Sequence, residues 1–217
     1  MAMQLHELHP TLIHAPLVLL PAAAFTDLAA ASSGWGARRL VLDATGRRLW
    51  WAGVGGALVA GLAGMAASQE IRLDEPAARD AMWLHGMGNF GILLAGAGLA
   101  AWRSSHRATA LTAALGVGAV GAAVYTAWLG GELVYTHGAG VKGLPAGARS
   151  GVEDSPQLFS ASTPWRFVRD AAMGMAWLFR RGGRLAARKE PLAPAAMKAG
   201  EQASPGATTV GFQELRT

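Results

Sequence analysis

Four histidines stand near the ends of long apolar segments in this chain: His9, His14, His85 and His137. Ionisable side chains are costly inside a bilayer, so histidines at membrane depth are candidates for function. Neutral imidazole is also a common ligand of haem iron and of transition metals. If the apolar segments form one antiparallel bundle, all four histidines lie at a similar height on the same side of it. The pattern therefore predicts a haem or metal site at that end.

The leading ligand pair is His14 and His85, because each lies about one turn inside its apolar segment. Two neutral imidazoles from different helices can bind the iron of a b-type haem from both faces. His9 and His137 flank their segments and are the second choice as ligands. A structural role is the alternative for each histidine. His14, for example, can bond a carbonyl that Pro16 leaves without its usual partner.

Other polar residues on the same side would support such a site. Asn89 lies one helical turn beyond His85 and can orient a ligand. Haem propionates need cationic groups at the water boundary, where the sequence places Arg72 and Arg79. No catalytic residue is assigned, since the chain lacks the HExxH pattern of zinc proteases. An electron-transfer or accessory subunit is therefore favoured over a stand-alone enzyme.

Long apolar segments determine the expected fold. The chain has 217 residues, of which 52% are hydrophobic and 15% charged, whereas soluble domains have about 25% charged residues. Segments of about 20 apolar residues can cross a hydrocarbon core, and four occur, at residues 10–31, 49–67, 81–102 and 108–129. Tryptophans, which prefer the headgroup level, stand at segment ends: Trp50, Trp51, Trp83, Trp102 and Trp128. We expect an all-α, integral membrane, antiparallel four-helix bundle over residues 1–145.

Two features indicate how these helices pack. Small residues recur at every fourth position at Gly53, Ala57 and Gly61, which lets helix backbones approach closely. Asp27 lies about 20 Å from His14 along the first helix, so it belongs to the opposite end of the bundle. We expect Asp27 to pair with a loop arginine there.

Residues 146–217 are expected to form an extramembrane tail. Thr163-Pro164 is typical of a helix start, and the apolar run from 171 to 179 is too short to span a membrane. Residues 164–185 mix apolar and arginine side chains, which predicts an amphipathic helix on a membrane surface or against a partner. From Pro191 the chain is rich in Ala, Pro, Gly and Ser, as in flexible segments.

The net charge of +5 predicts orientation in a membrane and not nucleic-acid binding. Most of the basic surplus lies in the first loop and the tail, where anionic lipid accounts for it. Arginines are enriched in the first and third loops, so the positive-inside rule places these loops in the cytoplasm and both termini outside. The chain has no cysteine, which excludes disulfides, thiolate metal sites and covalently attached c-type haem.

Two segments resemble the signatures of a known family. Leu8–Leu17 resembles the opening signature, and Gly130–Val141 the closing signature, of a bacterial and archaeal membrane family catalogued as domain of unknown function 2231. Ala15 departs from the aromatic residue often present at that position. Related domains occur joined to, or encoded beside, Rieske-type and cytochrome proteins. The resemblance implies redox work by association. Together with the arginine count it predicts a multi-pass protein of a bacterial inner membrane with periplasmic termini.

These observations lead to three hypotheses. The first is a membrane subunit that holds haem b near the outer face and passes electrons between the quinone pool and a partner, either a larger membrane redox complex or a periplasmic cytochrome or Rieske-type protein. The second is a non-haem protein that binds or transports Cu or Zn with the same histidines. The third is an accessory or assembly subunit without a cofactor, whose histidines make interhelical hydrogen bonds.

Overall fold

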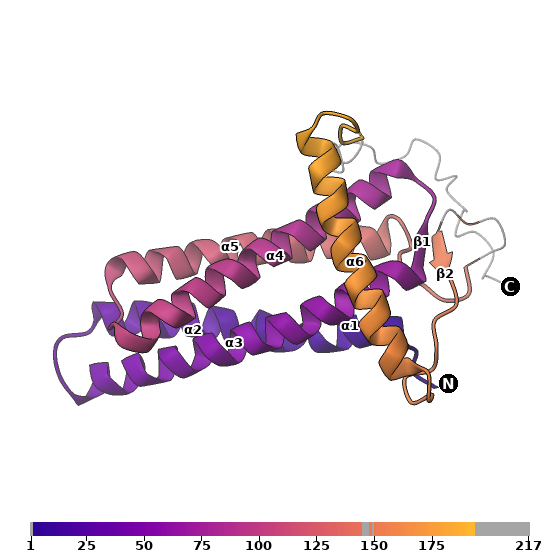
Figure 1. The fold of residues 1–217 in the computed structure, drawn as a ribbon. Coiled ribbons are helices and arrows are strands. Elements are labelled where there is room, and N and C mark those ends of the chain that lie inside the picture. Colours follow the sequence, from indigo (N-terminus) through magenta and orange to yellow (C-terminus); the bar gives the residue numbers. More distant parts are fainter. Residues whose placement is uncertain (1, 145–147, 149, 194–217) are drawn as a thin grey trace, which may run out of the picture.

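The computed structural model describes residues 2–144, 148 and 150–193, and it confirms the all-α membrane bundle. The four candidate spans of the chain are long, antiparallel helical rods that lie side by side (Figure 1). Each is long and apolar enough to cross a membrane. The first rod combines a short 3₁₀ helix, η1, with two α-helices, and each of the other rods is a single helix. Their bounds are η1 Leu5–Glu7, α1 Leu8–Leu12, α2 His14–Ser32, α3 Ala37–Glu70, α4 Pro76–Ser105 and α5 Ala110–Tyr135.

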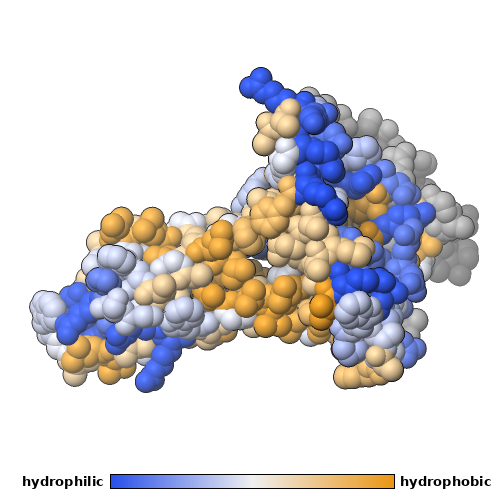
Figure 2. Space-filling model, viewed as in Figure 1, coloured by the Kyte–Doolittle hydropathy of each residue, from blue (hydrophilic) through white to orange (hydrophobic). Residues whose placement is uncertain are grey.

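Small and apolar side chains fill the centre of the bundle. Helix α2 packs against α3 and α5, and α4 packs against α3 and α5. Leu20, Ala23, Trp50 and Ile92 are buried at the centre of this core. Most of the remaining apolar surface faces outward along the rods, where a membrane helix meets lipid (Figure 2).

The helices extend beyond the segments expected from hydropathy. Residues 37–48, expected as a loop, form the first three turns of α3, and α5 continues to Tyr135. The extension of α3 holds Asp43, whose side chain accepts hydrogen bonds from α4 and from the loop that follows it. Tertiary contacts thus stabilise helix outside the apolar window.

The row of small residues in α3 only partly serves close packing. A Cβ at Gly53 would lie 2.6 Å from Leu20 Cδ2 of α2, so glycine is needed there. Gly61 has open space where its Cβ would be. The expectation of one continuous packing row is therefore wrong at Gly61, because the row turns away from the neighbouring helices.

A small extramembrane layer covers one end of the bundle. Strand β1, Ile71–Leu73, pairs antiparallel with β2, Ser150–Val152, and a single bridge joins Gln4 to Gln157. These short pairings were not expected from the sequence. They tie the chain start and the segment after α5 to the end of α3. We call this the histidine end, since it lies beside His9 and His85.

The tail helix that the sequence predicts is present as α6, Thr163–Ala186. It crosses the outside of α3 and α4 at the histidine end instead of running along them (Figure 1). Its Gly174 leaves no room for a side chain against the Met65 carbonyl of α3. Most of the flexible tail expected from Pro191 lies outside the described residues.

Candidate functional site

The structure brings His85 of α4 next to His9 of α1. Their ring centroids lie 6.2 Å apart and the ring planes make an angle of 84°. His14, the expected partner of His85, is exposed on the outside of the bundle, where its Nδ1 lies 3.3 Å from the Thr11 carbonyl of its own helix. The second-choice histidine His9 therefore occupies the position that His14 was expected to fill.

Helix geometry explains why His9 and not His14 faces inward. The backbone of Ile13 is right-handed helical, with φ −60° and ψ −23°, so α1 and α2 follow one helical path. Pro16 packs against Gly56 of α3. Successive residues of a helix are rotated by about 100°. His9, about two full turns before Pro16, therefore lies on the same face as Pro16. His14 is rotated by about 200° from Pro16 and points away from α3.

The two buried histidines are held in the same way. His9 Nδ1 lies 2.9 Å from the Ala60 carbonyl of α3, and His85 Nδ1 lies 2.8 Å from the Thr126 carbonyl of α5. A carbonyl can only accept, so each Nδ1 carries the proton. Each Nε2 therefore keeps its lone pair, which is the form of imidazole that binds a metal.

A glycine makes room for each ring. A Cβ at Gly64 would lie 2.9 Å from His9 Nδ1, and a Cβ at Gly130 would lie 2.9 Å from His85 Cε1. In both cases the glycine lies four residues after the carbonyl that the histidine bonds. The two helical hairpins of the bundle thus present one histidine each in matching surroundings.

Asn89 contacts His85 as its position one turn away predicts. Its amide nitrogen donates to the His85 carbonyl at 2.8 Å and lies 3.3 Å from Nε2 and 3.4 Å from Nδ1 of the ring. The amide nitrogen is thus within hydrogen-bond distance of both ring nitrogens. Its oxygen accepts a hydrogen bond from Thr126 Oγ1 at 3.2 Å. Asn89 therefore lies beside the ring and is the hydrogen-bond partner of its Nε2.

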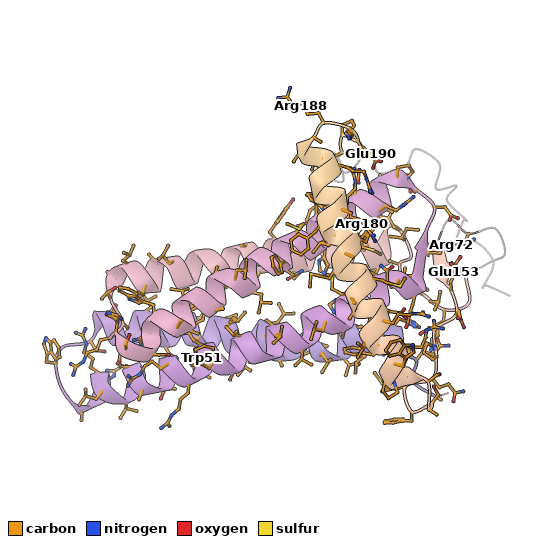
Figure 3. The ribbon with its side chains drawn as sticks, viewed as in Figure 1. Trp51, Arg72, Glu153, Arg180, Arg188 and Glu190 are labelled. Carbon is orange, nitrogen blue, oxygen red and sulfur yellow. The ribbon has the colours of Figure 1, made fainter. Side chains whose placement is uncertain are left out.

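The other expected site residues lie around the histidine end but do not join the pair. His137 Nδ1 lies 3.5 Å from a Glu75 carboxylate oxygen. Arg72 faces Glu153 beside the β1–β2 ribbon, with 3.8 Å between its Nε and Oε1 of that residue (Figure 3). Arg79 is exposed and makes no ion pair among the described residues. These three side chains are polar groups near the surface of the histidine end.

A second polar cluster at this end was missed at the sequence level. His6 Nδ1 lies 2.9 Å from Ser155 Oγ, which donates to Glu70 Oε2 at 2.5 Å. His6 and Glu70 are buried, and His6 Nε2 and Glu70 Oε1 have no hydrogen-bond partner within the described part of the chain. The cluster joins three separate segments, which is why no local sequence signal identifies it.

The opposite end holds a buried ion network, which confirms that Asp27 pairs with an arginine. Arg103 is fully buried and bonds Asp27 through Nε at 2.8 Å and Asp43 through Nη2 at 2.9 Å. Trp50 Nε1 also donates to Asp27 at 2.8 Å. Nearby, Trp51 donates to Ser104 at 3.0 Å and links α3 to α4 (Figure 3). These bonds join α2, α3 and α4 at what we call the arginine end.

Within the described residues, no group of three or more His, Cys, Asp or Glu side chains is placed to hold a metal ion. The histidine pair therefore offers two nitrogen ligands and no third ligand of these types. The model of the family described as "Predicted membrane protein (DUF2231)" matches residues 5–143. The chain belongs to this family.

The DUF2231 match includes all four spanning helices and both members of the histidine pair. It ends before β2 and α6, so the tail helix is an addition to the family domain. No curated protein and no solved structure matches this chain.

Proposed function

We propose that this DUF2231 protein is a membrane electron-transfer subunit that binds one b-type haem through His9 and His85. The observation that supports this most directly is the matched pair of imidazoles, each with Nδ1–H bonded to a helix carbonyl. Such a bond fixes the ring orientation and the tautomer, and it makes the free nitrogen a better metal ligand.

His9 and His85 would hold the haem together, since their ring centroids lie 6.2 Å apart. The two rings also come from different helical hairpins, as expected for a cofactor clamped at the centre of a bundle.

The number of ligands favours haem over zinc. Haem iron takes two axial protein ligands in a b-type cytochrome, whereas zinc sites generally use three or four protein ligands. The described residues supply two. Haem would supply one-electron chemistry, and the chain would bind it, orient the ligands and exclude water. Arg79, exposed at the same end, is suited to meet a propionate.

The position of the pair suits exchange of electrons at a membrane surface. His9 and His85 lie at the end that carries the extramembrane strands and α6. Arginines gather at the opposite end, at the start of α3 and around the end of α4, and the positive-inside rule would put that end in the cytoplasm. The pair would then face the periplasmic side of an inner membrane, where it passes electrons between quinone and a periplasmic redox partner.

The test is a dithionite-reduced minus air-oxidised visible spectrum of detergent-purified protein from cells supplied with haem. We expect b-type bands at about one haem per chain, lost in His9→Ala and His85→Ala and kept in His14→Ala. Added imidazole should restore the bands in His85→Gly, which separates loss of a ligand from loss of fold. Absence of these bands in the wild-type protein would contradict haem binding. Stoichiometric Cu or Zn in the same material would instead support the hypothesis of a non-haem metal protein.

A further inference from the structure

Helix α6 contacts α4 at one of two tryptophans that stand near opposite ends of the apolar span. Trp83 Nε1 of α4 donates to the Leu178 carbonyl of α6 at 2.9 Å. Trp102 follows Trp83 along α4 by about 28 Å, at about 1.5 Å per residue. A hydrocarbon core is about 30 Å thick, so the two tryptophans are about one core thickness apart. Helix α6 contacts the one at the histidine end.

One face of α6 is fixed to the bundle. Asp170, Gly174, Leu178 and Arg181 follow one another at three- and four-residue spacing and are all buried. Arg181 Nη2 bonds the Asp80 carboxylate of α4 at 2.7 Å. The rotation of α6 about its own axis is therefore set, and its remaining two flanks point in defined directions.

The first flank is apolar and faces the hydrocarbon side. Val168 and Phe179 lie on it at about 100° per residue, and their exposed fractions are 59% and 49%. The Phe179 ring meets Phe90 of α4 edge-on, with 5.4 Å between ring centroids. Phe90 lies about 10 Å farther along α4 than Trp83, toward the middle of the span. This flank is therefore continuous with the lipid-facing surface of α4.

The second flank carries three arginines and the exposed Met173, and it faces the extramembrane layer. Arg166 bonds Asp154, and Arg184 bonds Glu190, at 2.8 and 2.9 Å, and both acids lie outside the spanning helices. Arg180 on the same flank is exposed and makes no ion pair among the described residues (Figure 3). Beyond α6, the surface changes from apolar to hydrophilic (Figure 2).

We propose that α6 is an interfacial helix bound by the phospholipid leaflet on the histidine side of the bundle. Val168 and Phe179 insert among the upper acyl chains, and Arg180 lies beside lipid phosphates. Two flanks of opposite polarity at one membrane boundary are what a leaflet requires, and a cationic side chain interacts favourably with anionic headgroups. A lipid leaflet requires the apolar flank to lie on the hydrocarbon side and the arginines on the water side. A protein partner would not require this arrangement.

The cysteine-free chain allows a direct test by spin labelling. Single cysteines at Val168, Phe179 and Arg180 would be labelled in the full-length protein, reconstituted in vesicles that contain phosphatidylglycerol. Val124, exposed in the middle of α5, gives the hydrocarbon reference, and Glu153, on the extramembrane layer, gives the water reference. All five positions are exposed, so the substitutions should leave the fold intact.

We expect the labels at 168 and 179 to be relaxed by oxygen in preference to a water-soluble nickel complex, as at 124. The label at 180 should be relaxed by nickel, as at 153. Nickel access at 168 and 179 would overturn the proposal, because the flank would then face water. Labels at these two positions that neither reagent reaches would also overturn it, since another protein surface would then cover the flank.

Discussion

Gly130 of α5 leaves the space that the His85 ring occupies, since a Cβ at Gly130 would lie 2.9 Å from Cε1 of that ring. The carbonyl that His85 bonds, at Thr126, precedes this glycine by one helical turn. Ala60 and Gly64 of α3 stand in the same relation to His9. Each ring is therefore positioned by a helix backbone, which holds it more rigidly than a mobile side chain would.

Gly130→Ala should displace the His85 ring. Overpacking of a filled site costs about 1–3 kcal/mol, while alanine by itself gains about 1 kcal/mol over glycine in a helix. We expect a net loss of stability, measured as a lower midpoint of thermal unfolding in detergent. Gly131→Ala is the matched control, because its Cβ would make only ordinary contacts with Tyr135. Equal midpoints for the two variants would show that His85 does not lie against Gly130.

Arg103→Met should destabilise the arginine end strongly. The change leaves two buried carboxylates, Asp27 and Asp43, without their cation. Breaking a buried pair costs about 3–5 kcal/mol. Arg107→Met is the control, because that arginine lies over the Trp35 ring, an exposed contact of about 0.5–1 kcal/mol. Adding Asp27→Asn and Asp43→Asn to Arg103→Met should recover part of the loss; no recovery would contradict an electrostatic cause.

Gly174→Ala should release α6 from the bundle without unfolding the spans. A methyl group at this position has no room against the Met65 carbonyl of α3. Hydrogen exchange followed by mass spectrometry should show faster exchange over residues 163–186 and unchanged exchange in α5. Gly183→Ala on the same helix meets open space and should exchange like the wild type. Slow exchange in both variants would mean that α6 does not pack through Gly174.

The start of α6 should loosen in acid. Arg166 lowers the pKa of Asp154 through a hydrogen bond and its positive charge. A carboxyl with a lowered folded pKa stabilises the fold above its unfolded pKa, and this contribution is lost as pH falls through the folded value. Exchange at residues 163–167 should therefore accelerate as pH drops below about 4, after correction for intrinsic rates. In Asp154→Asn this additional acceleration should be absent.

The sequence alone determined the four spans and one of the ion pairs. Runs of apolar residues specify membrane helices because an unsatisfied backbone group in lipid costs several kcal/mol, so each run must be helical. The pairing of Asp27 with an arginine also followed from its depth, since a lone charge at that position is costly. The amphipathic α6 was visible because apolar and basic side chains segregate at helical spacing.

Only the tertiary structure decided which histidines meet. Residues five apart on one helix point about 140° from each other, so His9 and His14 cannot both face the bundle. Sequence depth favoured His14, but the packing of Pro16 on Gly56 turns His9 inward. Which histidine faces inward depends on the rotation of the first helix about its axis relative to α3. That rotation is set by the positions at which small residues of one helix make room for side chains of the other. Such matching between distant segments is a property of the assembled bundle and not of either segment by itself.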